Sequence, residues 1–392
     1  MVAEASAPEI RFAQWLLVSI LFAMFISTSA SVGLEIICYS LFAASRVLRI
    51  RLVRIFQTGP GISLALFIST IVVAALHGPA SWDDRLGALV SWRKIFLFFL
   101  AAAVFDGDRA RRTYLTALSW LCLIAVVLSY LTCVIPISHG AVGRGIVLKD
   151  SALQGLVFAV GVAATMWSGL TSWNAAVAGL LVMNIAFVTP GRIGYLALVI
   201  VAAALGLARN VKWAVLLLLA CVGLLTASPQ ARERVAKGIV ELQNYSSSPV
   251  LTSIGWRVVM WRNTVEIIRE HPILGVGTGG FEVAYRRKIE GSHGWQAEPT
   301  NDPHNFYLKV LAEQGVAGLF AFLAFIVFAA IAKSPIRELH RGVLVAFCAA
   351  NLFASDFSRS NEGRFLFLWL GMALAGVGAS GQRSAERTST TG

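Results

Sequence analysis

Long apolar runs are the feature that most constrains what this chain can fold into. Its 392 residues are 57% hydrophobic and only 14% charged, with a mean hydropathy of +0.71. Soluble proteins carry about a quarter charged residues, so the charge here is nearly halved. The runs are continuous rather than alternating, which is typical of membrane helices and not of a membrane β-barrel. The sequence therefore predicts an all-α polytopic membrane protein.

We expect about twelve transmembrane helices. Several are short for a hydrocarbon core of about 30 Å, which indicates tilted or re-entrant segments. The first run is followed at once by another apolar run, so we interpret it as a retained helix and not as a cleaved signal peptide. The predicted helices lie near residues 12–27, 31–45, 58–76, 87–105, 113–135, 151–170, 173–189, 193–208, 213–227, 305–332, 342–355 and 364–380.

The distribution of Lys and Arg predicts the side of the membrane on which each loop lies. Basic residues concentrate in alternate loops, as they do on the cytoplasmic side of membrane proteins. This bias places both termini in the cytoplasm and explains much of the net charge of +12. It indicates contact with anionic membrane lipids and gives no sign of nucleic-acid binding. The basic segments expected inside are 46–54, 109–112, 209–212 and 333–341.

One polar segment, residues 228–303, is much longer than the other loops and is expected on the outer side. It divides the chain into residues 1–227, with nine predicted transmembrane helices, the segment itself, and residues 304–392, with three helices and a cytoplasmic tail. The spacing of apolar residues predicts that the long segment is itself helical. Its three expected helices lie within residues 227–243, 254–272 and 281–290.

Neither a cofactor nor a metal is indicated. The glycine-rich stretch GVGTGGF (275–281) follows a helix and lacks the strand context of a dinucleotide-binding loop, so we interpret it as a turn between two helices. The acidic pairs at 83–84 and 106–108 have no evident third ligand nearby. The five cysteines lie in apolar runs without a Cys-x-x-Cys pair, which is typical of buried apolar residues.

Two arginines expected at the outer face are candidates for binding a phosphate. Arg192 lies in the bend TPGRIG between two predicted helices, where Pro190 and the flanking glycines would aim the side chain. Arg257 lies on the second helix of the long segment and shares a face with Trp261, whereas Arg262 points about 140° away. A guanidinium binds a phosphate through two parallel hydrogen bonds. The alternative is that both arginines are solvated or interfacial side chains.

His304 stands where the long segment returns to the membrane. Its ordinary pKa lies near neutrality, so it can act as an acid or a base. The helix that follows carries Lys309 and Glu313, which are four residues apart and are expected to pair. Gly315 and Gly318 would then allow a neighbouring helix or lipid chain to come close. The ring of His304 is therefore the candidate acid or base of the outer face.

Two stretches, GWRVVMWRNTVEIIREHPILGVGTGGF and HNFYLKVLAEQGVAGLFAF, together resemble the O-antigen ligase and polymerase superfamily of membrane glycosyltransferases. The first contains the pair Arg257 and Trp261 and then a His-Pro-x-x-Gly-x-Gly turn. The second begins with a His-Asn-x-x-Leu motif at His304. The spacing from His304 to Gly315 is similar to that of the ligase branch, which joins O-antigen to the lipid A core.

The resemblance implies a GT-C-like membrane glycosyltransferase in the inner membrane of a Gram-negative bacterium, with its active site at the periplasmic face. It implies O-antigen linked to undecaprenyl diphosphate as the donor and the lipid A core oligosaccharide as the acceptor. It also implies that neither metal nor cofactor takes part.

The resemblance further implies roles for individual residues. His304 would be the catalytic base, and Arg192 and Arg257 would stabilise the charge on the departing diphosphate. A single displacement would invert the anomeric centre. Further candidates for binding the diphosphate or the glycan are Arg144, Lys149, Arg93, Trp261 and Arg262.

Three other functions stay open. A polymerase of the same superfamily and a protein O-oligosaccharyltransferase differ from a ligase in the acceptor that they use. A lipid or small-anion transporter would place polar groups near the bilayer midplane, often in repeated halves. The sequence shows no such repeat, and its polar candidates cluster at the outer face, which favours chemistry at the membrane surface.

Overall fold

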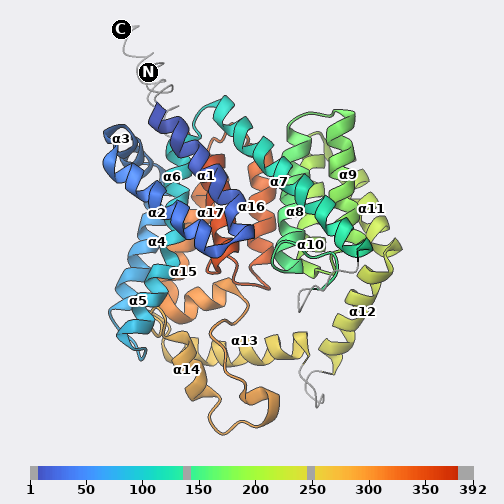
Figure 1. Ribbon diagram of the computed structural model, residues 1–392. Coiled ribbons are helices and arrows are strands. Elements are labelled where there is room, and N and C mark those ends of the chain that lie inside the picture. Colours follow the sequence, from blue (N-terminus) through green and yellow to red (C-terminus); the bar gives the residue numbers. More distant parts are fainter. Residues whose placement is uncertain (1–7, 136–142, 245–251, 378–392) are drawn as a thin grey trace.

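The computed structural model describes residues 8–135, 143–244 and 252–377, and within these ranges all regular structure is helical (Figure 1). All twelve predicted apolar segments coincide with helical structure to within a turn or two, so these predictions of helix are confirmed. The last residues of the predicted helix 364–380 and the tail after it lie outside the described residues. In chain order the helices are α1 (Pro8–Ile26), α2 (Thr28–Ala44), α3 (Arg46–Ile55), α4 (Gly59–Ala75), α5 (Trp82–Ser91), η2 (Trp92–Ile95), α6 (Phe96–Val104), α7 (Asp108–Val134), α8 (Ser151–Trp167), α9 (Ser172–Phe187), α10 (Arg192–Leu207), α11 (Val211–Ala227), α12 (Pro229–Gln243), α13 (Ser253–Glu270), α14 (Phe281–Lys288), η4 (Gly294–Ala297), α15 (Phe306–Ile331), α16 (Arg337–Ala350) and α17 (Ser360–Leu374).

By length, fewer helices can span a membrane than the sequence predicts. Within the described chain four helical segments are long and apolar enough, namely α1, α5 through α6, α7 and α15. The number rises to six if α3 with α4 and α11 with α12, which are bent by 89° and 83°, each count as one span. The shorter apolar helices α2, α8, α9 and α10 have 16 or 17 residues, below the ~20 that a hydrocarbon core requires. The prediction of twelve spans is therefore not confirmed.

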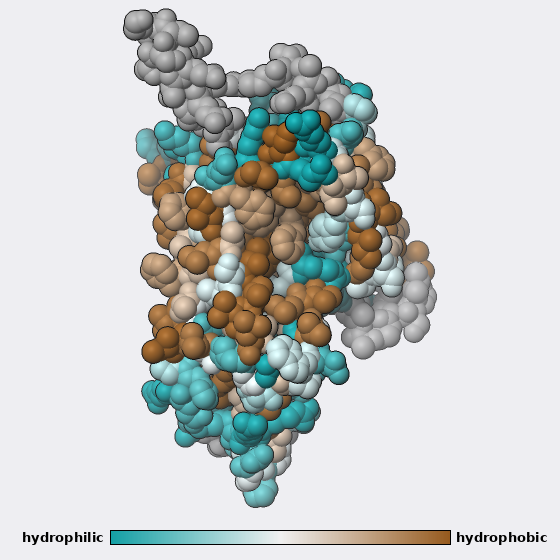
Figure 2. Space-filling view, turned by 90° about the vertical axis from the view of Figure 1, so that its left-hand side faces the viewer, coloured by the Kyte–Doolittle hydropathy of each residue, from teal (hydrophilic) through white to brown (hydrophobic). Residues whose placement is uncertain are grey.

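The surface of the molecule carries an apolar band. In Figure 2 hydrophobic side chains occupy the middle of the visible face, and hydrophilic ones gather towards both ends. Large apolar side chains such as Trp15, Val72, Trp120 and Leu219 are exposed on α1, α4, α7 and α11. Contiguous apolar surface of this extent marks contact with a membrane or another protein, and here it indicates a polytopic membrane protein.

Loops that were predicted to share the cytoplasmic side meet at one end of the molecule. Arg51 of α3 pairs with Asp106 before α7 at 3.1 Å, and Arg111 of α7 donates a hydrogen bond to the carbonyl oxygen of Ala375 after α17. Helices α12, α13 and α14 lie at the opposite end, below the bundle (Figure 1). The arrangement agrees with the grouping of loops that the basic residues indicate.

The long segment after α11 contains the three predicted helices. The chain bends at Ser228, whose side chain accepts a hydrogen bond from the backbone of Ala231, and Pro229 opens α12. Helix α13 ends just before Pro272, which cannot continue it. In Figure 1 α13 lies across the lower end of the bundle, with α12 at one end and α14 at the other.

Helix α15 is broken at Gly315, where φ is 65° and ψ is −166°. The glycine-rich turn between α13 and α14 packs into this break. The backbone N–H of Val276 donates to the carbonyl oxygen of Ala312 at 2.8 Å, and that of Val316 donates to Pro272 at 3.0 Å. These bonds satisfy backbone groups that the break would leave unpaired. The stretch predicted as a turn is therefore also hydrogen-bonded to α15 and stabilises its break.

The predicted ion pair between Lys309 and Glu313 is wrong. The side chain of Glu313 is buried and accepts a hydrogen bond from that of Gln314 at 3.3 Å. The ammonium group of Lys309 lies instead 3.4 Å from the carbonyl oxygen of Asn301. Residues four apart share a helix face, and this spacing predicts the ion pair. In the structure the glycine-rich turn packs against the part of α15 that contains Glu313, just before the break.

Gly315→Ala is expected to destabilise the protein by at least ~1–3 kcal/mol, because alanine rarely adopts a left-handed backbone conformation. An added Cβ would also lie 2.0 Å from the carbonyl oxygen of Ile273. Thermal unfolding of the purified protein in detergent measures the effect. Gly179→Ala is the matched control, since a Cβ there meets nothing within 4 Å. Equal melting temperatures for the two variants would contradict the role of the break.

Candidate functional site

Arg257 and His304 line one cavity at the end of the molecule that carries α12, α13 and α14. Its volume is about 440 Å³, within the usual range of ligand-binding sites. Arg257 comes from the second turn of α13, and His304 from the segment just before α15. The structure therefore brings together two of the three predicted catalytic residues. The other lining residues are Thr252, Ser253, Trp256 and Glu298.

The backbone of His304 has a φ of 50°, a left-handed conformation that histidine adopts more readily than most residues. Its N–H donates a hydrogen bond to the Asp302 carboxylate at 2.9 Å. The indole N–H of Trp261 donates to the carbonyl oxygen of Pro303, also at 2.9 Å. These two bonds hold the segment that carries the ring. A strained residue that its surroundings keep in place is typical of functional sites.

The imidazole of His304 is half-buried. Burial lowers its pKa below the ordinary value of 6.5; Asp302 raises it, whereas the positive charges of Arg359 and Arg257 lower it further. The ring is therefore neutral at neutral pH. Within the described residues no hydrogen bond joins it to another side chain or to the backbone, so a ring nitrogen can accept a proton from a hydroxyl group in the cavity.

The guanidinium of Arg257 is half-buried and only partly bonded. Its Nη1 donates to the carbonyl oxygen and the hydroxyl of Ser253, one turn earlier, at 3.2 and 2.8 Å. Its Nε is buried and has no hydrogen-bond partner in the described structure. Burial lowers the pKa of Arg257, and the charges of Arg192 and Arg359 act in the same direction. An incompletely paired cation of this kind favours an anionic ligand.

Arg192 is the first residue of α10 and contacts α12. Its guanidinium lies 3.3 Å from the carbonyl oxygen of Arg234 and 3.9 Å from the carboxylate of Glu241, both on α12. Glu241 also accepts a hydrogen bond from the backbone of Ile254 in the first turn of α13, at 3.1 Å. Glu241 thus connects Arg192 to the turn that precedes Arg257. The third predicted catalytic residue is close to the site but does not line the cavity.

Arg359 belongs to the same site, although the sequence analysis did not single it out. Its Nε lies 3.6 Å from the carboxylate of Asp302, which also accepts a hydrogen bond from the Ser355 hydroxyl. Its charge lowers the pKa of both Arg257 and His304. The polar stretch SDFSRSNEGR (355–364), directly before an apolar run, is the signal that would have found it.

Lys149 connects to this site through Glu362. The ammonium group of Lys149 lies 3.0 Å from the carboxylate of Glu362, and the guanidinium of Arg359 lies 3.8 Å from the same group. In the loop before α17, Asp356 is buried, and its burial together with the charge of Glu362 raises its pKa to about 7. A chain of charged groups therefore runs from Lys149 through Glu362 and Arg359 to Asp302.

Three further candidates lie elsewhere. Arg93 pairs with the buried carboxylate of Glu35 at 3.0 Å. Arg144 is exposed and forms no ion pair with any residue in the described ranges. The side chain of Arg262 is 80% exposed and pairs with Glu266, one turn further along α13, at 3.6 Å. None of these arginines lines the cavity.

The arrangement combines a neutral imidazole with several arginines. The imidazole can take a proton from an attacking hydroxyl, and the arginines can stabilise negative charge on a departing phosphate. Among the described residues no group of three His, Cys, Asp or Glu side chains could hold a metal ion. A neutral imidazole and an arginine in one cavity can serve a transfer in which a hydroxyl displaces a phosphate.

Comparison with known proteins agrees with this chemistry. Residues 175–323 match the model of a family described as O-antigen ligase. The matched range extends from α9 into α15 and contains Arg192, Arg257 and His304. A search of curated proteins gave no match. The match covers 149 of the 392 residues, so it shows a likeness to this family over that range, and it does not separate ligases from polymerases.

Proposed function

We propose that this protein is an O-antigen ligase, which transfers a glycan from undecaprenyl diphosphate to a sugar hydroxyl of the lipid A core. The observation that carries the proposal is the cavity shared by Arg257 and His304. Its support comes from the family match over residues 175–323 and from the apolar surface of the bundle. The ligase is preferred to the polymerase because of the motif spacing after His304.

In the proposed reaction the arginines act on the donor. The bond between the anomeric carbon and the diphosphate oxygen breaks, and its electron pair leaves with the diphosphate. Arg257, with its incompletely bonded guanidinium, would bind this group directly. Arg192 and Arg359 add positive charge close by. Fixed cations that face developing negative charge lower the barrier because they need no reorganisation as the bond breaks.

His304 acts on the acceptor. The attacking hydroxyl oxygen forms the new bond to the anomeric carbon and loses its proton to the neutral imidazole. A single displacement inverts the anomeric centre. Asp302 holds the backbone of His304 and interacts favourably with the imidazolium that forms. The activated donor supplies the free energy, so the proposal requires neither a nucleotide nor a metal.

The proposal also assigns sides and compartments. Residues 228–303 would be the periplasmic segment between the membrane regions 1–227 and 304–392, with both termini in the cytoplasm of a Gram-negative bacterium. The undecaprenyl tail would remain among membrane lipids beside the bundle while the sugars enter the cavity. The site would then lie at the level of the lipid phosphates, where a membrane-bound donor and acceptor can meet.

Reconstitution with defined substrates tests the proposal. Purified protein in liposomes receives undecaprenyl-diphosphate-linked glycan together with lipid A core, further lipid-linked glycan, or a pilin-like protein. Transfer to lipid A core is the expected result. Extension of the lipid-linked glycan would show a polymerase, and modification of the protein would show an oligosaccharyltransferase. Movement of the lipid across the bilayer without transfer would overturn enzymatic function.

The acid limb of the pH profile of kcat/KM is expected below pH 6.5, the ordinary pKa of histidine. The base must be neutral to accept a proton, and His304 stays neutral until the pH falls through its lowered pKa. Asp302→Asn removes a negative charge that raises this pKa and should move the limb to still lower pH. Initial rates across the acidic and neutral range measure both effects. A limb above 6.5, or one that Asp302→Asn moves upward, would contradict the assignment.

A further inference from the structure

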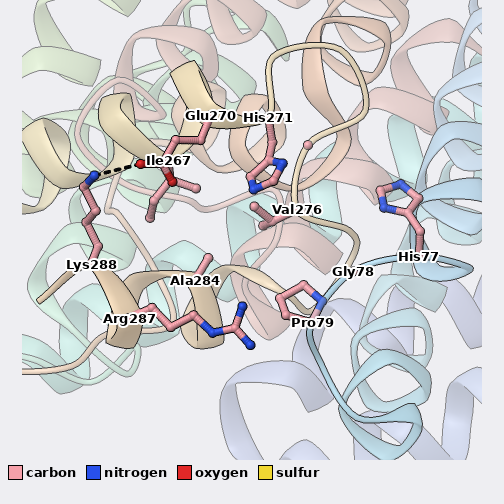
Figure 3. A pocket seen from close by; sticks show the side chains of 11 residues that line it. His77, Gly78, Pro79, Ile267, Glu270, His271, Val276, Ala284, Arg287 and Lys288 are labelled. Carbon is pink, nitrogen blue, oxygen red and sulfur yellow. Dashed lines mark hydrogen bonds and ion pairs between the residues drawn. The ribbon is translucent and has the colours of Figure 1, made fainter. Parts of the chain in front are cut away.

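A second polar cavity lies at the other end of α13. Its volume is about 440 Å³, and it lies between the last turn of α13, the helix α14 and the turn after α4 (Figure 3). Glu270 and Arg257 are thirteen residues apart on one continuous helix, which places the two cavities about 20 Å apart. None of the proposed catalytic residues lines this second cavity.

The cationic groups of the second cavity differ in how they are paired. Lys288 lies 3.0 Å from the carboxylate of Glu266 and 2.9 Å from that of Glu270, so its charge is compensated. Arg287 forms no ion pair with any residue in the described part of the chain. Figure 3 shows its guanidinium beside Pro79 at the edge of the cavity. Among the lining cations, Arg287 is therefore the one without a carboxylate partner in the described structure, and its exposed side chain is free to meet a ligand.

Two imidazoles from different elements line the same cavity. His271 follows the last residue of α13, and His77 follows α4. The Nε2 atom of His77 is buried and has no hydrogen-bond partner in the described structure. Because the Nε2 atom of His77 is buried, the donors open to a ligand are those of His271 and Arg287, which are both exposed. An arginine and an imidazole from two elements, without a protein carboxylate paired to Arg287, fit an oxyanion.

We propose that this cavity binds a phosphorylated or carboxylated sugar of the acceptor glycan. The Glu270 carboxylate would repel a bare phosphate, but it can accept hydrogen bonds from sugar hydroxyls. Pro79, Ile267 and Ala284 supply small apolar surfaces beside these polar groups. This inference rests on the proposed glycan transfer, and it specifies which class of sugar the acceptor carries. An acceptor that reaches from this cavity to His304 must be an oligosaccharide, because the two sites are about 20 Å apart.

Titration of the full-length protein in detergent tests the cavity itself. Glucose 6-phosphate is the probe, and calorimetry measures its binding. The protein titrated carries Arg257→Gln, so that the probe does not bind at the catalytic cavity. Glucose 6-phosphate should bind more tightly than glucose or inorganic phosphate, and adding Arg287→Gln should weaken binding about tenfold or more. Arg286→Gln is the control, because Arg286 is exposed and pairs with Glu282. Arg287 is also exposed, so both variants should keep the same melting temperature.

Three results of the titration would overturn the proposal. Unchanged affinity in Arg287→Gln would mean that the cavity does not hold the oxyanion. Equal affinity for inorganic phosphate would remove the sugar from the assignment. Displacement of glucose 6-phosphate by phosphatidylglycerol added in the same detergent, but not by phosphatidylcholine, would show a lipid headgroup site instead.

Kinetics test the assignment to the acceptor. In an otherwise unchanged protein, Arg287→Gln should raise the KM for the oligosaccharide acceptor about tenfold while the KM for the donor and kcat stay the same. An unchanged acceptor KM would overturn the assignment even if the sugar phosphate binds. If the unaltered protein transfers no glycan to any acceptor, the proposed function fails, whereas the titration still decides whether the cavity binds a sugar phosphate.

Discussion

Replacing His304 by alanine or by asparagine is expected to lower kcat/KM for glycan transfer by about 10²–10⁴-fold, the usual contribution of a positioned general base. The two substitutions separate chemistry from backbone strain. Asparagine tolerates the left-handed conformation that His304 adopts, whereas alanine does not. A loss of activity common to both variants therefore reports the missing base. Rates of transfer to lipid A core in liposomes measure it.

The control for His304 is His293→Ala. His293 is exposed in the same long segment and lines neither cavity. Its substitution should leave kcat/KM unchanged, and all three variants should accumulate in the membrane to the same level. Full activity of His304→Asn with low activity of His304→Ala would assign the residue to backbone geometry and remove it from the reaction.

The position of His304 could be predicted because its signals are local. A histidine directly before an apolar helix is visible in the sequence, and so is the four-residue spacing of Arg257 and Trp261. Both features meet in the structure, where Trp261 holds Pro303 and Arg257 shares a cavity with His304. The predicted helices were confirmed for the same reason, since apolar runs and helix-ending prolines act within a few turns of the chain.

The contacts that complete the site could not be predicted because they join distant parts of the chain. Arg359 meets Asp302 across an intervening pair of helices, and Lys149 meets Glu362 more than two hundred residues away. Helical periodicity gives the face on which a side chain lies but not the partner that this face meets. Arg359 therefore looked like an ordinary basic residue of a short loop.

The break in α15 was missed for a related reason. Helical spacing indicates a continuous helix through Gly315, and the residues directly before it, Ala312, Glu313 and Gln314, are good helix formers. The break depends on the backbone of the turn after α13, which supplies hydrogen bonds on both sides of Gly315. At the same place Glu313 is buried and accepts a hydrogen bond from Gln314 instead of pairing with Lys309. Tertiary hydrogen bonds overrode the local preference in both cases.

Arg257→Gln is expected to lower kcat by about 10²–10³-fold, the usual cost of removing one group that stabilises transition-state charge. Arg257→Lys should recover only part of this loss, because an ammonium group keeps the charge but cannot form two parallel hydrogen bonds to a phosphate. Arg262→Gln is the matched control. It lies on the same helix, but its side chain is exposed and pairs with Glu266. Single-turnover transfer rates at saturating donor measure the effect on the chemical step.

Arg192→Gln should cost less activity than Arg257→Gln, because the two guanidinium groups differ in their partners. Arg192 is held by Glu241 and the carbonyl oxygen of Arg234, whereas Arg257 faces the cavity with one buried nitrogen unbonded. A cation already compensated by a carboxylate adds less to the field at the phosphate. Equal losses for both variants would show that Arg192 turns into the cavity when the donor binds. A larger loss for Arg262→Gln than for Arg257→Gln would mean that the opposite face of α13 binds the diphosphate.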